Sequence, residues 1–182
     1  MVNRKERRRK EQELKRIEKK LNSENPKMLF EYQVNQLQGL GPIINTYITI
    51  TDSHKKLLEQ AGLPIPELVK CRFLIDTGAH KSLVKHEIAE QAKIKLINTD
   101  NPIKGVGVDV TGKSYIGRIL FICESKKVRG AKHNVFVDAE IASGTLNNSQ
   151  FIDGLIGRDV LRYFELVYNG KSGKVTLIYQ KK

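Results

Sequence analysis

The sequence predicts a mostly β domain with two or three short helices, preceded by a charged N-terminal helix. Three observations lead to this fold class. Short runs of β-branched and apolar residues, bounded by Gly, Asp and Asn, begin near Pro42 and continue to the C-terminal end. The stretch before residue 28 differs from them, because it is rich in charge and poor in apolar residues. The length of 182 residues fits one domain with an appendage.

Composition limits the class of protein. The chain is 40% hydrophobic and 29% charged, as in an ordinary globular protein, and no apolar run approaches the roughly 20 residues of a membrane helix. Two cysteines, Cys71 and Cys123, are too few for a disulfide scaffold or a cysteine-based metal site, and we expect buried thiols. The basic N-terminal residues are not followed by the apolar stretch of a secretory signal, so we expect a cytoplasmic protein.

The net charge of +12 is concentrated at one end of the chain. Residues 1–27 carry 11 Lys/Arg and 5 Glu, a net +6, and the rest of the chain carries the other +6. Good helix formers over residues 4–21 predict a helix on which Leu14, Ile17 and Leu21 form one narrow stripe. We interpret residues 1–27 as a basic tail, helical or disordered, and residues 28–182 as the folded domain. The role of the tail stays open between binding nucleic acid or a membrane surface, docking on the domain, pairing with a second copy, and solvation alone.

Within the domain, residue alternation and turn residues predict the elements in order. The strand patterns cover residues 44–50, 68–75, 103–110, 115–123, 134–141, 151–156, 165–168 and 174–179. The helix patterns cover residues 53–62, 82–92 and 158–164. We expect Ser53 to cap the first of these helices and Gly62 to end it. Two hairpins are predicted, with turns at Thr111-Gly112 and around Asn169-Gly170.

One motif contains a candidate catalytic residue. It is Asp76-Thr77-Gly78-Ala79, which directly follows the apolar strand predicted at 68–75. An ionised carboxylate at the end of an apolar strand is costly to bury unless hydrogen bonds or a nearby charge compensate. Gly78 has no Cβ, so its backbone can approach that carboxylate and donate to it. The Thr77 hydroxyl can bond to another backbone. Taken alone, the same residues are also a common turn sequence.

A second motif lies about 80 residues downstream, where Leu155-Ile156-Gly157-Arg158-Asp159 ends an apolar run. Together the two motifs resemble those of the retropepsin-like aspartic proteases, which combine Asp-Thr-Gly-Ala with a distant pair of apolar residues, Gly-Arg-Asp or Gly-Arg-Asn, and a Leu-containing helix. Residues 41–179, about three-quarters of the chain, are similar in particular to the bacterial retropepsin-like proteins. The resemblance implies a closed, barrel-like acid protease lobe.

The resemblance also implies a role for each matching residue. Asp76 would hold the attacking water, Thr77 would join two active-site loops, and the Gly78 carbonyl would accept a substrate N–H. The implied substrate-binding residues, which include a glycine-rich flap, are Ala79, His80, Lys104, Gly105, Val106 and Gly107. The implied structural support comes from Leu155, Ile156, Gly157, Arg158 and Asp159. No metal and no cofactor are implied.

Peptide hydrolysis of this type needs two carboxylates, because one takes a proton from water while the other, protonated, polarises the carbonyl. The chain has one Asp-Thr-Gly, and Asp153-Gly154 lacks the hydroxyl residue. We therefore expect a homodimeric endopeptidase in which two copies of Asp76 share a proton, with greatest activity on the acid side of neutrality. The alternative is a catalytically weak dimerisation or binding module with the same fold and a polyanion-binding tail.

One position departs from the family pattern. Viral members usually have an acid directly after the residue that matches Ala79, where it pairs with the arginine that matches Arg158. This chain has His80 there, followed by Lys81. Arg158 is then expected either to pair with Asp159 or to have no such partner. The basic side chains at 80 and 81 lead to the hypothesis that acidic residues are favoured in the substrate.

Overall fold

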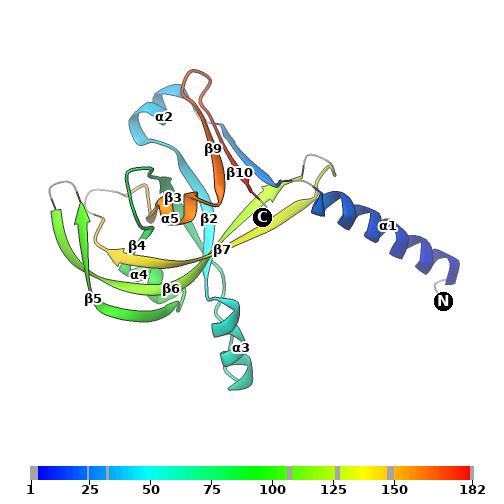
Figure 1. The fold of residues 1–182 in the computed structure, drawn as a ribbon, viewed down its shortest axis with the longest axis horizontal. Helices are drawn as coiled ribbons and strands as arrows, with labels where there is room; N and C mark the ends of the chain where they lie inside the picture. Colours follow the sequence, from blue (N-terminus) through cyan, green and yellow to red (C-terminus); the bar gives the residue numbers. More distant parts are fainter. Residues whose placement is uncertain are drawn as a thin grey trace.

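The computed structural model describes residues 4–23, 25–31, 33–105, 108–125, 128–146 and 150–180. The fold is mostly β with short helices, as the sequence predicts (Figure 1). The strands are β1 (Lys27–Glu31), β2 (Ile43–Thr49), β3 (Val69–Ile75), β4 (Leu83–Lys85), β5 (Lys95–Gly105), β6 (Val108–Glu124), β7 (Lys132–Gly144), β8 (Gly154–Ile156), β9 (Phe164–Asn169) and β10 (Lys174–Tyr179). The helices are α1 (Arg4–Asn22), α2 (Val34–Leu40), α3 (Asp52–Gln60), α4 (His86–Gln91) and α5 (Arg158–Leu161).

Within the described residues, six strands close into a barrel in the order β2, β3, β8, β4, β7 and β6, and β6 pairs back with β2. The pairs β3–β8 and β4–β7 are parallel, and the other pairs of the ring are antiparallel. Parallel neighbours cannot be joined by a tight turn, so they bring distant parts of the chain together. Residues 73–75 of β3 pair with residues 154–156 of β8 in this way. The two sequence motifs are therefore neighbours at one end of the barrel.

The barrel core follows the alternation of the strands. On β2, Ile44, Thr46 and Ile48 are buried, and on β3 Cys71 and Phe73 are buried. The largest fully buried side chains are Phe73, Phe121, Leu37, Ile44, Ile48, Ile119, Ile141, Ile156, Leu177, Val84, Val160 and Val175. Burial of this kind is the main source of the stability of the domain.

Both cysteines are buried and free, as the sequence predicts. Burial raises the pKa of the Cys71 thiol and of the Cys123 thiol to about 12. Thiols with such a pKa stay protonated near neutral pH and are poor nucleophiles.

Three further strands extend the sheet beyond the barrel. β1 pairs with β6 at Lys27 and with β10 over its full length, and β9 pairs with the other side of β10. α1 projects away from the sheet (Figure 1), and its described side chains are exposed except for Ile17, which is half-buried. No helix in the described part of the chain is long and apolar enough to cross a membrane.

The hairpin turn predicted at Thr111-Gly112 is wrong. β6 continues through both residues and pairs there with β5, and the pairing of the two strands extends to Gly105 opposite Val108. Residues 106–107, between the two strands in the sequence, lie outside the described residues. A polar Thr-Gly pair favours a turn only locally, and ladder hydrogen bonds with a neighbouring strand outweigh that preference.

Other boundaries differ because of tertiary contacts. The helix predicted over 82–92 begins at His86, because residues 83–85 form β4 and pair with β7 and β8. Thr51, rather than Ser53, caps α3, since Thr51 Oγ1 accepts a hydrogen bond from the N–H of His54 at 3.3 Å. The sequence patterns also missed β1, α2 and residues 95–102 of β5.

Candidate active site

β3 brings Asp76 to the end of the barrel. The N–H of Ile75 donates to the carbonyl of Pro42, and the N–H of Asp76 donates to the carbonyl of Ile156, each at 3.0 Å. The backbone is thus held from both sides immediately before the carboxylate. Ile156 is fully buried, and its neighbour Leu155 on β8 is half-buried, so this support is part of the core.

The backbone of the following turn holds the Asp76 carboxylate. Oδ1 accepts hydrogen bonds from the N–H groups of Gly78 at 2.8 Å and Ala79 at 3.2 Å. A Cβ on Gly78 would lie 3.1 Å from Oδ1, closer than ordinary van der Waals contact, so glycine allows this approach. The predicted donation from Gly78 is confirmed. No donor in the described part of the chain reaches Oδ2, and this oxygen is open to another partner.

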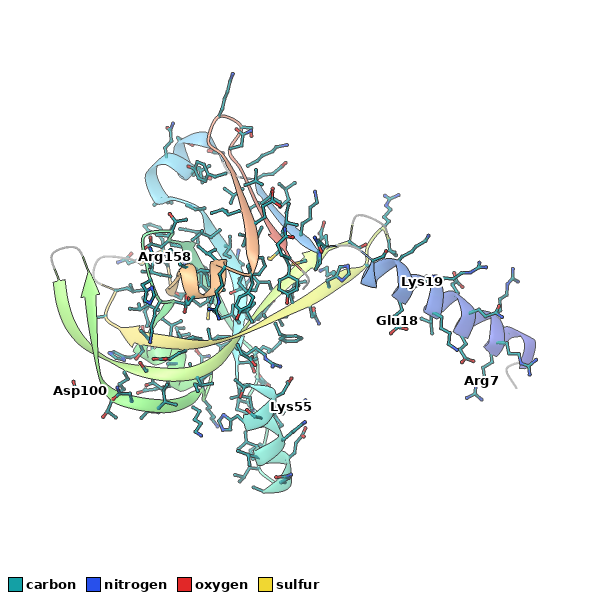
Figure 2. All side chains as sticks on the ribbon, in the orientation of Figure 1. Arg7, Glu18, Lys19, Lys55, Asp100 and Arg158 are labelled. Atoms are coloured by element: carbon teal, nitrogen blue, oxygen red, sulfur yellow. The ribbon has the colours of Figure 1, made fainter. Side chains whose placement is uncertain are left out.

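Arg158 binds the carbonyl side of the same turn. Its Nη1 donates to the carbonyl oxygens of Thr77 and Gly78, each at 2.9 Å. The first two backbone N–H groups of α5 donate to the next two carbonyls of the turn, at 3.0 and 3.3 Å. Four successive carbonyls are therefore bound by the start of α5. Figure 2 shows Arg158 in the region where α5 meets the end of β3.

Ser82 and Asp159 form a polar link beneath the turn. Asp159 Oδ1 accepts from the N–H of Ser82 at 2.9 Å and from its hydroxyl at 2.8 Å. Ser82 Oγ accepts from the N–H of Gly157 at 3.0 Å. Ser82 is fully buried, so its polar groups need such partners. A Cβ on Gly157 would lie 2.6 Å from the carbonyl carbon of Lys81, so the backbone of the second motif is in direct contact with the segment that follows the first.

Asp153 is bound by Arg72 and has a structural role. Its Oδ2 accepts from the backbone N–H of Arg72 at 2.8 Å and from the guanidinium Nε at 3.3 Å, and its Oδ1 accepts from Nη2 at 3.2 Å. Burial acts to raise the pKa of Asp153, but the hydrogen bonds and charge of Arg72 outweigh it and lower the pKa below its usual value. Asp153 thus ties the segment before β8 to β3, and it does not form a second copy of the Asp76 turn.

Of the predicted flap residues, Lys104 and Gly105 lie at the end of β5. Lys104 pairs with Asp109 and Gly105 pairs with Val108 across the two strands. Val106 and Gly107 lie outside the described residues. In the view of Figure 1 the paired strands β5 and β6 rise at the left, and α5 lies between them and the β9–β10 pair.

Of the two alternatives for Arg158, the pairing with Asp159 is not formed, because Asp159 is bound by Ser82 and the Arg158 guanidinium by two carbonyls. The other alternative holds, since Arg158 has no acidic partner in the described part of the chain. Lys81 also has a partner within the chain. Its Nζ lies 2.6 Å from Glu140 Oε1, and this hydrogen bond lowers the pKa of Glu140. Of the two basic residues after the turn, His80 is the exposed one, and Lys81 is half-buried.

Two residues of this framework, Ser82 and Arg72, were missed by the sequence patterns. Ser82 precedes the apolar pair Leu83-Val84, so a buried hydroxyl next to the core could have been suspected. Arg72 occupies an outward position of β3, and its partner Asp153 is 81 residues away. The sequence contains no indication of that pairing.

No family model matches the sequence, and no curated protein matches it. The chain is similar to a solved structure described as the crystal structure of a retropepsin-like aspartic protease from Rickettsia conorii. The identity is 12%, the match covers 86% of this chain and 93% of that chain, and the TM-score is 0.45. A likeness at this level says nothing of individual residues, so the chemistry of the site rests on the geometry of this chain.

Proposed function

We propose that the chain is a cytoplasmic aspartic endopeptidase, which hydrolyses peptide bonds with a water activated by the Asp76 carboxylates of two copies. One observation carries the proposal. Asp76 Oδ1 is fixed by two backbone N–H groups, whereas Oδ2 accepts from no donor in the described part of the chain. An oriented carboxylate with one open oxygen can act as a general base toward water.

A second carboxylate is needed, and the other two acids of the site are engaged. Arg72 binds Asp153, and Ser82 binds Asp159. A second copy of Asp76, related by a two-fold axis, supplies the missing group. The exposed position of Thr77 on the turn supports this arrangement, since its hydroxyl is accessible to the loop of a partner.

In the proposed reaction the two carboxylates share one proton. The ionised carboxylate accepts a proton from water while the water oxygen attacks the peptide carbonyl carbon, and the protonated carboxyl donates its proton to the carbonyl oxygen. A proton then passes to the amide nitrogen, the C–N bond breaks and the amine leaves. Because one carboxyl must be ionised and the other protonated, the rate is greatest on the acid side of neutrality. Gly105 to Gly107 act as the flap that closes over the peptide.

The decisive experiment compares the purified protein with Asp76→Asn on a peptide library between pH 4 and pH 7, with products read by mass spectrometry. Asp100→Asn is the matched control, because Asp100 is an exposed aspartate on β5. We expect cleavage by the unmodified protein and by Asp100→Asn, and none by Asp76→Asn. Equal cleavage by the protein and Asp76→Asn would exclude the mechanism. No cleavage by any of them, together with a stable dimer in sedimentation, would favour the dimerisation or binding module.

A further inference from the structure

The charges of α1 are divided between two faces. With 3.6 residues per turn, six of the described basic side chains fall within one arc of about 140°, together with a single amide. This basic face consists of Arg8, Arg9, Gln12, Lys15, Arg16, Lys19 and Lys20. The four glutamates of the helix all lie outside it, at Glu6, Glu11, Glu13 and Glu18. Figure 2 shows Lys19 on one side of α1, and Glu18 and Arg7 on the other.

The basic face is exposed and largely without counter-charge. All of its side chains are exposed. Lys15 lies 3.3 Å from Glu11, and both side chains are more than 60% exposed, so this pair is weak and exchangeable. The other five basic residues form no ion pair within the described part of the chain. Their charge is therefore available to an external polyanion.

We propose that the basic face of α1 binds the phosphate backbone of duplex nucleic acid, independently of the proposed protease activity. The helix has 19 residues and a length of about 28 Å, along which one strand of a duplex presents roughly eight phosphates. Arginine and lysine on one face, with no acid among them, match such a row of negative charges. The contacts are to phosphates, so little sequence preference follows.

The position of the glutamates favours a duplex over a membrane surface. Leu14 and Ile17 lie opposite the basic face, and the glutamates flank them on the helix. A helix that inserted this apolar stripe would bring its acids to the anionic headgroups and turn its basic face away from them. α1 also contains no aromatic residue on which the bases of a single strand could stack. Contacts with the phosphate backbone of a duplex use only the basic face. They bring no glutamate to an anionic surface and need no aromatic side chain.

The test uses the full chain and two charge-matched double variants. Arg9→Gln with Arg16→Gln removes two charges from the basic face, and Arg7→Gln with Lys10→Gln removes two charges from the other side of the same helix. Binding is measured by fluorescence anisotropy with 20-base-pair DNA and RNA duplexes of random sequence, between 50 and 200 mM salt. We expect the basic-face variant to bind roughly 50-fold more weakly at 100 mM salt, with a salt slope reduced by about two. The matched variant should lose less than about threefold.

Three outcomes would overturn the proposal. Equal losses in the two variants, with helix content unchanged by circular dichroism, would show that net charge rather than the basic face determines binding. Absence of binding to both duplexes at 50 mM salt would exclude the face as a nucleic-acid site. Tighter binding to phosphatidylserine vesicles than to either duplex, abolished by Leu14→Gln, would assign α1 to a membrane surface instead.

Discussion

Two aspartates lie at opposite ends of the paired strands β3 and β8, and the groups that bind their carboxylates differ. Asp153, before β8, has both oxygens bound by the Arg72 side chain, a cation. Asp76, after β3, has one oxygen bound by two backbone N–H groups and faces neutral donors only. At one end of the strand pair, Asp153 therefore acts as a clamp between the two strands. At the other end, Asp76 keeps one carboxylate oxygen without a donor in the described part of the chain. The donors around a carboxylate, rather than its place beside a strand, determine its role.

The largest expected effect tests the open member of this pair. Asp76→Asn should reduce kcat/KM by about 10³-fold or more, because the amide cannot act as a base toward water. Its carbonyl oxygen still accepts from the N–H groups of Gly78 and Ala79, so the thermal midpoint should move by less than about 3 °C. Peptide cleavage and calorimetry measure the two quantities. A large loss of stability with activity retained per folded molecule would reverse the assignment.

Replacing the glycine that follows each aspartate should also affect stability differently, with the larger loss beside Asp153. Gly154→Ala should lower the free energy of unfolding by about 2–3 kcal/mol, because overpacking cannot be relieved by a rigid backbone. Its Cβ would lie 2.4 Å from the carbonyl oxygen of Leu83. Gly78→Ala should cost less than about 1 kcal/mol, since the contact at 3.1 Å is to the Asp76 side chain. Urea unfolding of the two variants measures both, and similar losses would contradict the comparison.

Asp153→Asn tests the clamp itself. Loss of the charged hydrogen bonds from Arg72 should lower the free energy of unfolding at pH 7 by about 1–2 kcal/mol. The pKa of Asp153 is lowered on folding, so its contribution is complete above its unfolded value of roughly 3.9 and is lost as the pH falls through the folded value. The difference between the protein and the variant should therefore shrink below about pH 4. A difference in unfolding free energy that grows toward low pH would contradict a lowered pKa of Asp153 in the folded protein.

Arg158→Lys tests how the open aspartate is positioned. An ammonium cannot reproduce the planar guanidinium that bridges the carbonyls of Thr77 and Gly78. We expect a loss of about tenfold in kcat/KM, mainly in kcat, with less than about 1 kcal/mol in stability because the guanidinium is exposed. Arg162→Lys is the matched control, because Arg162 is exposed and follows the same short helix. Equal kcat/KM for both variants would show that Arg158 does not position the turn.

The smallest expected effect concerns His80, which is exposed beside the turn, whereas Lys81 binds Glu140. His80→Asp should reduce cleavage of acidic peptides relative to neutral ones by a factor of up to about five, the range of an exposed charge pair. Competition between paired peptides measures the ratio. An unchanged ratio would count against a preference for acidic substrates.

Local patterns predicted those parts of the fold and of the candidate site that depend on neighbouring residues. β2 and β3 follow from alternation, because period-two burial is a property of each strand. The donation from Gly78 to Asp76 follows from their spacing of two residues. β4 and the continuous β6 could not be predicted, because their pairing with strands elsewhere in the chain outweighs local helix and turn preferences.

The sequence by itself determined the chemical groups: one Asp-Thr-Gly turn, two cysteine thiols and an N-terminal helix rich in basic residues. Only the tertiary structure decided their partners. Arg158 binds carbonyls 80 and 81 residues away, Arg72 binds Asp153 81 residues away, and Lys81 binds Glu140 59 residues away. The physical reason is that a hydrogen bond depends on distances of about 3 Å and on direction, which the closure of the barrel sets and the spacing along the chain does not.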